Sequence, residues 1–141
     1  MVAAPDEIVD LLAGFVLFAD LPRPQLEEVS HSLDEQWFSE GQRVLRQGFT
    51  GSGLYFIVDG EVSVEVDRTQ RARLGRGEYF GEVSVLLGEP PVADVVALGP
   101  LRCLVLAEPE AEGFLKAHPT VMYRMMQAQA RRLRTANLFR G

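Results

Sequence analysis

The segment with the clearest chemical potential is residues 77–96, G-E-Y-F-G-E-V-S-V-L-L-G-E-P-P-V-A-D-V-V. It combines a glycine-bounded turn, a short apolar stretch (Val83–Leu87), a second turn at Gly88 and a strand-like run. A short helix that begins just after Gly81 points its first backbone N–H groups outward, and such donors can hold an anion or a phosphate. Glu82 at that mouth is a poor anion ligand but a suitable acceptor for a sugar hydroxyl. On these residues alone, a plain turn with a solvated glutamate explains the segment equally well.

The sequence lacks the residue sets that catalysis or metal binding would need. His31 and His118 fall in predicted helical segments, away from the strand-rich region, so we predict no metal site. Cys103 has apolar neighbours, which is typical of a buried structural thiol and not of a nucleophile. The glycine pairs within residues 51–53 and 75–77 precede strand-like runs, so neither is a dinucleotide-binding fingerprint. We therefore predict that the protein is not an enzyme and carries no metal or cofactor.

The elements that position this segment follow from the apolar period. Residues 1–34 contain short helical stripes, with apolar residues three and four apart. Residues 35–107 contain roughly six to eight short strands punctuated by glycine, a pattern typical of a rolled antiparallel sheet. Residues 108–141 are assigned to C-terminal helices, and Pro119 suits the first turn of the long helix expected over residues 120–139. The predicted fold is mainly β: an antiparallel β-roll of the jelly-roll type, with short N-terminal helices and a long C-terminal helix.

Individual strands can be placed within the roll. The run Leu54–Val58 reads as a buried strand, and Val62–Val66 alternates apolar and polar residues as a half-buried strand does. Asp59–Gly60 between them marks a tight turn. Two further strands are expected over Val92–Leu98 and Leu101–Ala107.

Composition and charge limit the function classes. The 141 residues are 47% hydrophobic and 24% charged, which is ordinary for one globular domain spanning residues 1–141. The net charge of −6 argues against a general nucleic-acid binder. No apolar run is long enough to cross a bilayer, and the single cysteine fits a reducing compartment, so we expect a cytoplasmic protein without membrane contact.

The charge is unevenly distributed along the chain. Residues 116–141 contain no acidic residue. Their basic residues are Lys116, Arg124, Arg131, Arg132, Arg134 and Arg140. Cations suit the C-terminal end of a helix, which is the simpler explanation; an acidic partner is the alternative.

Several motifs in the right order resemble the cyclic nucleotide-binding domain family. Phe80-Gly81-Glu82 through Gly88-x-Pro90 is similar to the family's phosphate-binding cassette, within the segment 77–95. The stretch from Gln47-Gly48 to Gly53-Leu-Tyr-Phe-Ile-Val-Asp-Gly-Glu-Val is similar to the glycine turns around its core strand. The end of the chain, from His118-Pro119 onward, resembles the long C-helix of catabolite-activator-type regulators. The resemblance covers almost the whole chain, and we expect the DNA-binding domain of those regulators to be missing.

The resemblance implies a set of ligand-binding residues. Glu82 matches the carboxylate that accepts the ribose 2′-hydroxyl, and Gly81, Ser84 and Val92 match positions whose backbone faces the ribose-phosphate. The full implied set is Phe80, Gly81, Glu82, Val83, Ser84, Val92, Ala93, Ala136 and Asn137. The implied ligand is cyclic AMP or cyclic GMP.

The match fails at one decisive position. The arginine that pairs with the cyclic phosphate in the family aligns with Pro91, which offers neither a charge nor an N–H. Losing the cation partner of a buried charge costs roughly 3–5 kcal/mol, about 10²–10⁴ in affinity. Arg73, Arg76 and Arg102 are the candidate replacements, but solvation of the guanidinium with a packed stem is the usual arrangement of a surface arginine, and we favour it here. The side-chain direction of Asp94 stays open.

The C-terminal helix carries a second signal. Met122, Met126, Gln129, Leu133 and Ala136 follow a spacing of four and three residues, as in a coiled coil. Val121 and Met125 form another apolar edge that would cover the roll. The resemblance implies a parallel homodimer through this helix, with Gln129 fixing the register; packing against the helix's own roll is the alternative.

These observations predict a regulatory sensor domain of the cyclic nucleotide-binding type, with weakened or altered ligand binding because of Pro91. One alternative is a ligand-independent dimerisation or protein-interaction module with a vestigial pocket. Another is the N-terminal fragment of a transcription regulator.

Overall fold

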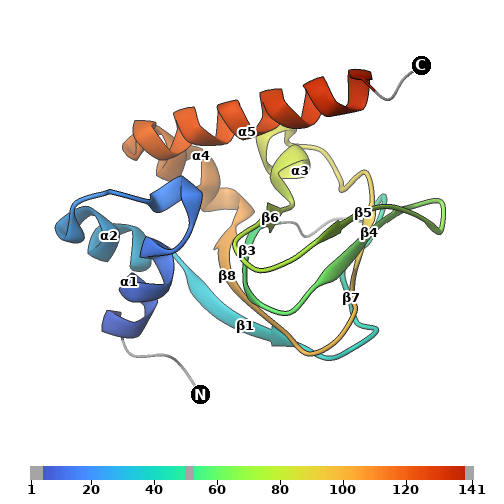
Figure 1. Cartoon of the computed structure of the whole chain (residues 1–141), viewed down its shortest axis with the longest axis horizontal. Helices are drawn as coiled ribbons and strands as arrows, with labels where there is room; N and C mark the ends of the chain where they lie inside the picture. The colour runs from blue at the N-terminus through green and yellow to red at the C-terminus, as the bar shows by residue number, and fades with distance from the viewer. Residues whose placement is uncertain (1–4, 50–52, 139–141) are drawn as a thin grey trace.

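The computed structural model describes residues 5–49 and 53–138, and its strands form two four-stranded antiparallel sheets (Figure 1). The strand orders are β1-β8-β3-β6 in the first sheet and β2-β7-β4-β5 in the second. The strands are β1 (Asp34–Phe38), β2 (Arg43–Leu45), β3 (Gly53–Asp59), β4 (Val62–Val66), β5 (Thr69–Leu74), β6 (Tyr79–Phe80), β7 (Asp94–Ala97) and β8 (Leu101–Ala107). The predicted antiparallel β-roll is confirmed. The strand expected over Val92–Leu98 is shorter, since residues 92–93 precede β7.

Strand β3 is apolar without interruption because both of its faces are buried. Phe56 packs into the core beneath the helices, whereas Ile57 packs into the core between the two sheets. Neighbouring side chains of a strand point to opposite faces, so the alternation divides β3 between the two cores. Strand β8 does the same with Leu104 and Cys103.

Helices flank the roll at both ends of the chain. They are α1 (Pro5–Ala13), the 3-10 turn η1 (Val16–Phe18), α2 (Arg23–Ser30), α3 (Glu82–Leu87), α4 (Glu108–Ala117) and α5 (Pro119–Leu138). The long helix begins at Pro119 as predicted, and Phe139 lies outside the described residues. Short helices thus precede the roll and a long one follows it, as the sequence predicts.

An aromatic cluster joins the N-terminal helices to the roll. The rings of Phe15 and Phe18 meet the ring of Phe56 edge to face, with centroid distances of 6.0 and 5.2 Å. This arrangement aligns the positive edge of one ring with the negative face of another. All three side chains are buried, so the cluster fixes the N-terminal segment on the first sheet.

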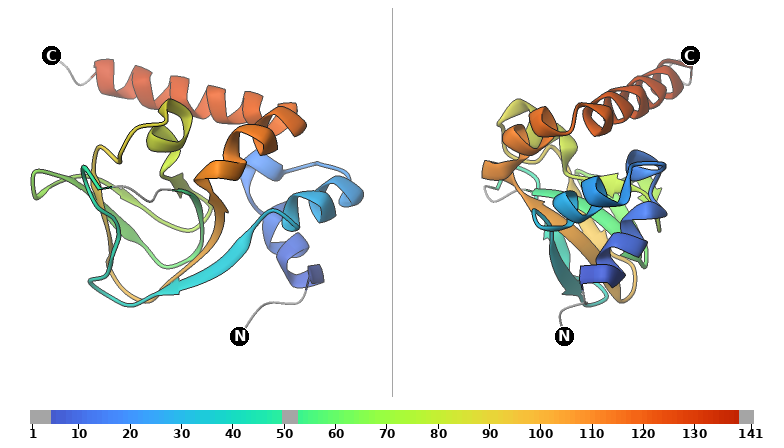
Figure 2. Two further views of the ribbon diagram at one scale, coloured as in Figure 1. Left: turned by 180° about the vertical axis from the view of Figure 1, so that it is seen from behind. Right: turned by 90° about the vertical axis from the view of Figure 1, so that its left-hand side faces the viewer.

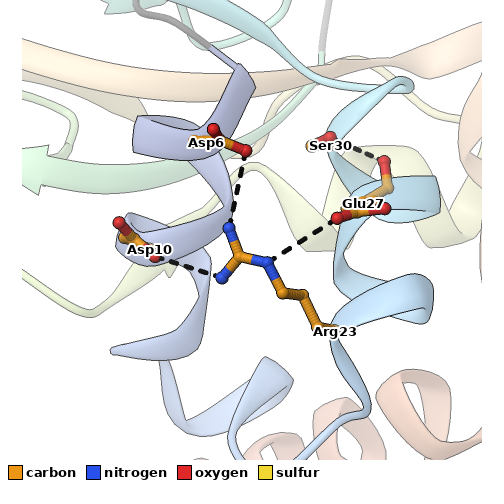
Figure 3. A network of polar contacts seen from close by, with 5 residues as sticks. All are labelled: Asp6, Asp10, Arg23, Glu27 and Ser30. Carbon is orange, nitrogen blue, oxygen red and sulfur yellow. Dashed lines mark hydrogen bonds and ion pairs between the residues drawn. The ribbon is translucent and has the colours of Figure 1, made fainter.

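A surface arginine links α1 to α2 (Figure 3). The guanidinium of Arg23 lies 3.5 Å from a carboxylate oxygen of Asp6, 3.4 Å from one of Asp10 and 3.6 Å from one of Glu27. All four side chains are more than half exposed, and exposed pairs contribute little to stability. The buried apolar residues therefore hold this pair of helices together, and the contacts of Arg23 help to orient α1 relative to α2.

Helix α5 lies across α4 and α3, and its C-terminal half extends toward the side of the roll where β4 and β5 lie (Figures 1 and 2). Val121 and Met125 are buried against the helical core, which confirms the predicted apolar edge toward the roll. Arg124 donates hydrogen bonds to the carbonyl oxygens of Val16 and Leu17, both at 3.3 Å. These contacts anchor the first half of α5 and leave its second half over the cavity described below.

Candidate ligand-binding cavity

A cavity of about 600 Å³ lies between the roll, the segment around α3 and the C-terminal half of α5. Its size is within the range of small-molecule sites. The roll contributes Leu45, Val64, Arg71, Ala72, Leu74, Glu78, Phe80 and Val95. The segment around α3 contributes Gly81, Glu82, Val83, Ser84, Pro91, Val92 and Ala93, and α5 contributes Arg131, Arg132, Thr135 and Ala136.

Gly81 makes the sharp connection between β6 and α3. Its φ of +90° is in the left-handed region, and a Cβ built on it would lie 2.0 Å from the carbonyl oxygen of Gly53. Only glycine fits such a position without strain or displacement of the backbone. The preceding Phe80 stacks on Tyr55 at a centroid distance of 4.9 Å, so the chain enters α3 from a rigid aromatic base.

Glu82 brings a buried carboxylate to the cavity wall. Its side chain is 10% exposed, and Oε1 accepts a hydrogen bond of 3.0 Å from Nη1 of Arg132. Oε2 is buried and has no hydrogen-bond partner among the described residues. A buried acceptor without a donor carries a desolvation penalty that a ligand hydroxyl or N–H would remove.

Arg132 connects α5 to the entrance of α3. Besides Glu82, it donates to the carbonyl oxygen of Tyr79 at 3.3 Å and to Oε1 of Gln129 at 3.4 Å. Its guanidinium lies over the Tyr79 ring, 4.6 Å from the centroid, which is a favourable cation–π distance. Burial raises the pKa of the Tyr79 hydroxyl, while the charge of Arg132 acts in the opposite direction.

Gln129 belongs to the same network. Its Oε1 accepts a hydrogen bond of 3.0 Å from the Tyr79 hydroxyl. The side chain therefore faces the roll. The predicted role in fixing the register of a dimer would need this side chain to point toward a partner helix, whereas it contacts Tyr79 of its own chain.

The exit of the segment around α3 has no positive charge at the place expected from the family. Pro91 is buried, and its carbonyl oxygen accepts a hydrogen bond of 2.9 Å from the N–H of Gly48. Asp94 does not line the cavity: Oδ1 accepts from the N–H of Gln47 at 2.7 Å, and Oδ2 lies 3.8 Å from Nε of Arg43. Asp94 thus fixes the loop before β3 and does not repel a ligand directly.

The three arginines considered as replacements for the missing cation lie elsewhere. Arg73 pairs with Glu61 on the surface at 3.2 Å. Arg102 pairs with the buried carboxylate of Glu35 and contacts Glu7 at 3.2 Å. Arg76 lines a separate cavity of about 120 Å³ beside α1. None of the three lines the larger cavity, which agrees with the interpretation that we favoured from the sequence.

The cavity instead receives cations that the sequence analysis did not assign to it. Arg71 comes from β5, and Arg131 and Arg132 come from α5. The sequence signal that could have identified Arg131 and Arg132 was the run of basic residues near the end of α5. We attributed that run to the favourable interaction of cations with the C-terminal end of a helix, which requires no ligand. No feature of the sequence singled out Arg71.

The site residues implied by the resemblance gather around this one cavity. Phe80–Ser84, Val92, Ala93 and Ala136 all line it, although their ligand contacts stay a prediction. The side chain of Asn137 lies outside the described residues. The sequence did not predict the apolar walls of the cavity that β2, β4 and β5 contribute, because these strands lie outside the segment 77–96 and only the fold brings them to the cavity.

The remaining chemically distinctive residues have structural surroundings. Cys103 is fully buried, and burial raises the pKa of its thiol to about 12, so the reactive thiolate is scarce near neutral pH. His118 is buried, with Nδ1 3.4 Å from Nε2 of Gln25. Residues 5–49 and 53–138 contain no group of three or more potential metal ligands. Within those ranges, no helix has the length and apolarity to cross a bilayer.

Comparison with known families agrees with this geometry. The family model for the cyclic nucleotide-binding domain matches residues 35–118, which include the roll except for the first residue of β1 and also the segment around α3. The chain belongs to the cyclic nucleotide-binding domain family. The matched range includes the whole segment 77–95, whose role as a phosphate-binding cassette stays a prediction from the resemblance.

The relatives come from several kinds of regulated protein. The chain is 30% identical over 132 residues to a putative potassium channel protein of Rhodopseudomonas palustris, covering 91% of this chain and 32% of the relative. It is 35% identical over 101 residues to the cAMP-dependent protein kinase regulatory subunit of Mucor circinelloides, covering 69% and 24%. The chain therefore spans about a third or less of these two relatives.

A solved cyclic nucleotide-binding domain from Methylobacillus flagellatus has the same architecture. Its TM-score is 0.78 at 26% identity, over 93% of this chain and 79% of that one. The relative from Mucor circinelloides is a regulatory subunit by name, which agrees with the predicted regulatory class.

Proposed function

We propose that this domain senses a nucleotide-like ligand in the cavity and that it binds cyclic AMP and cyclic GMP weakly, because Pro91 stands in the place of the phosphate-binding arginine. The observation that carries the proposal is the unpaired, buried Oε2 of Glu82 in the cavity wall. It marks a place where a ribose hydroxyl can donate. The free, buried thiol of Cys103 is compatible with a reducing compartment, and we place this function in the cytoplasm.

The regulatory step that we propose passes through Arg132. In the structure this residue joins Glu82 to α5. A ligand hydroxyl that donates to Glu82 shares that carboxylate with Arg132, so ligand binding and the position of α5 are coupled. A ligand that interacts differently with two positions of α5 shifts their populations.

Calorimetric titration with cyclic AMP and cyclic GMP up to millimolar concentration tests the binding function. We expect weak binding that Glu82→Gln reduces by roughly 10–100-fold, because a hydrogen bond to a charged group contributes about 1.5–3 kcal/mol. Glu89→Gln is the control, since Glu89 lies just beyond α3 and does not line the cavity. Absence of binding by the wild-type chain would favour a ligand-independent interaction module.

We also propose that the outer face of α5 forms a homodimer. Met122, Met126 and Leu133 are 42%, 59% and 63% exposed, and they share the stripe predicted from the sequence. Val121 and Met125 already cover the roll, so this second edge is available to a partner helix.

The double substitution Met126→Glu with Leu133→Glu is expected to convert the dimer to a monomer, because it places charges in an apolar seam. Sedimentation equilibrium measures the mass. Gln127→Glu with Arg134→Glu adds acidic side chains to a different face of the same helix and should leave the dimer intact. A dimer that survives the first pair of substitutions, or a wild-type monomer, contradicts this part of the proposal.

A further inference from the structure

The cavity contains two arginines with no internal partner. Arg71 on β5 and Arg131 on α5 line it, and neither forms an ion pair or hydrogen bond within the part of the chain that the structure describes. Arg132, by contrast, is engaged with Glu82, Tyr79 and Gln129. Arginine has only donors and keeps its charge at any physiological pH, so Arg71 and Arg131 offer unmatched donors to the cavity.

The segment around α3 contributes an acceptor to the cavity and no cation. Gly81–Ser84 and Pro91–Ala93 contribute one charged side chain, the carboxylate of Glu82. The other carboxylate of the cavity lining, Glu78, accepts a hydrogen bond of 2.8 Å from the N–H of Gly75. The charges of the cavity are therefore divided, with a hydroxyl acceptor at the start of α3 and free positive charge on β5 and α5.

This division determines where a negative charge of the ligand can lie. A 3′,5′-cyclic phosphate is fused to the ribose, so it stays close to the hydroxyl that Glu82 accepts and faces the wall where Pro91 replaces the cation. A phosphate outside the sugar ring sits on a flexible arm, which lets it turn away from that wall. It also carries nearly two negative charges at neutral pH and accepts paired hydrogen bonds from guanidinium groups.

We infer that the cavity takes a nucleoside 5′-monophosphate in preference to a cyclic nucleotide, with a ribose hydroxyl donating to Glu82 and the phosphate held between Arg71 of β5 and Arg131 of α5. The inference rests on the proposed binding function of this cavity. It also accounts for the basic end of α5, since positive charge at the mouth of a cavity raises the local concentration of anions in a chain whose net charge is −6.

Such a ligand would connect two elements through one anionic group. Arg71 and Arg131 belong to different elements and carry the same charge. A phosphate that accepts hydrogen bonds from both guanidinium groups would place a negative charge between them. The anionic group thereby acts on the same helix that Arg132 links to Glu82.

The test compares matched ligands by calorimetric titration of the full chain: adenosine, 5′-AMP and 3′,5′-cyclic AMP, with the corresponding guanine series. We expect the 5′-monophosphate to bind at least about 10-fold tighter than the nucleoside and the cyclic nucleotide, as for a charged hydrogen-bonded pair. Arg71→Gln and Arg131→Gln should each reduce that advantage to about threefold or less, with nucleoside affinity unchanged. Arg68→Gln and Arg134→Gln, at exposed arginines of the same hairpin and the same helix outside the cavity lining, should preserve it.

The possible outcomes separate this inference from the proposed function. Equal binding of nucleoside and 5′-monophosphate, or tighter binding of the cyclic nucleotide, overturns the inference and leaves the proposed function standing. Equal losses in the Arg71, Arg131 and control variants also overturn it, because the effect would then be one of overall charge. If no member of either series binds the wild-type chain, the proposed function itself fails, and the inference with it.

Discussion

Replacing Pro91 by arginine is expected to strengthen the binding of cyclic AMP by roughly 10²–10⁴-fold, since an uncompensated buried charge costs about 3–5 kcal/mol. Pro91 is buried and lines the cavity, so a side chain that begins there starts inside the site. Its backbone interaction with Gly48 uses the carbonyl oxygen, which any residue provides. Calorimetric titration with cyclic AMP measures the change.

The matched control is Pro91→Ala. It supplies a backbone N–H and removes the ring but adds no charge, so we expect an affinity within about threefold of the wild type. Thermal denaturation of each variant establishes whether the fold is retained. If Pro91→Arg folds normally and binds no better than Pro91→Ala, the missing cation is not the cause of weak cyclic nucleotide binding.

Replacing Gly81 by alanine should destabilise the protein by roughly 2–5 kcal/mol. The left-handed backbone costs a non-glycine residue about 1–2 kcal/mol, and forcing extra atoms into a packed site adds about 1–3 kcal/mol. The added Cβ would lie 2.0 Å from the backbone oxygen of Gly53, so the collision cannot be relieved by a side-chain rotation. Urea denaturation measures the free energy of unfolding.

Gly88 at the other end of α3 provides the comparison. Its φ is +66°, but nothing lies within 4 Å of the position of an added Cβ. Gly88→Ala should therefore cost only the conformational part, about 1–2 kcal/mol. Similar losses for the two variants would show that the approach of Gly81 to Gly53 is not a rigid contact.

Local sequence patterns were sufficient for the architecture. Alternation placed β4 over Val62–Val66, and the continuous apolar run placed β3, because strand faces follow a period of two. Pro119 located the start of α5, since proline is tolerated in the first helical turn. The predicted start of β7 was less accurate, because Val92 and Ala93 extend the apolar pattern but do not pair with a neighbouring strand.

The cassette was equally local. Phe80–Ser84 are contiguous, and their motif carries the turn, the short helix and the carboxylate together. The proline at position 91 and the resulting loss of charge are likewise visible in the sequence alone.

The sequence by itself determined the β-roll, the long final helix and the turn and short helix that bring Glu82 to the cavity, since each depends on neighbours within a few residues. Only the tertiary structure decided that Arg71, Arg131 and Arg132 share the cavity, that Gln129 contacts Tyr79, and that Asp94 holds the backbone of Gln47. The residues that these contacts bring together come from elements that lie tens of positions apart in the sequence. A periodic pattern in the sequence shows which face of a helix or strand is buried. Which other element packs against that face depends on how the chain folds back. In this protein the positive charge of the cavity comes from β5 and α5, and only the folded chain brings these two elements to the same cavity.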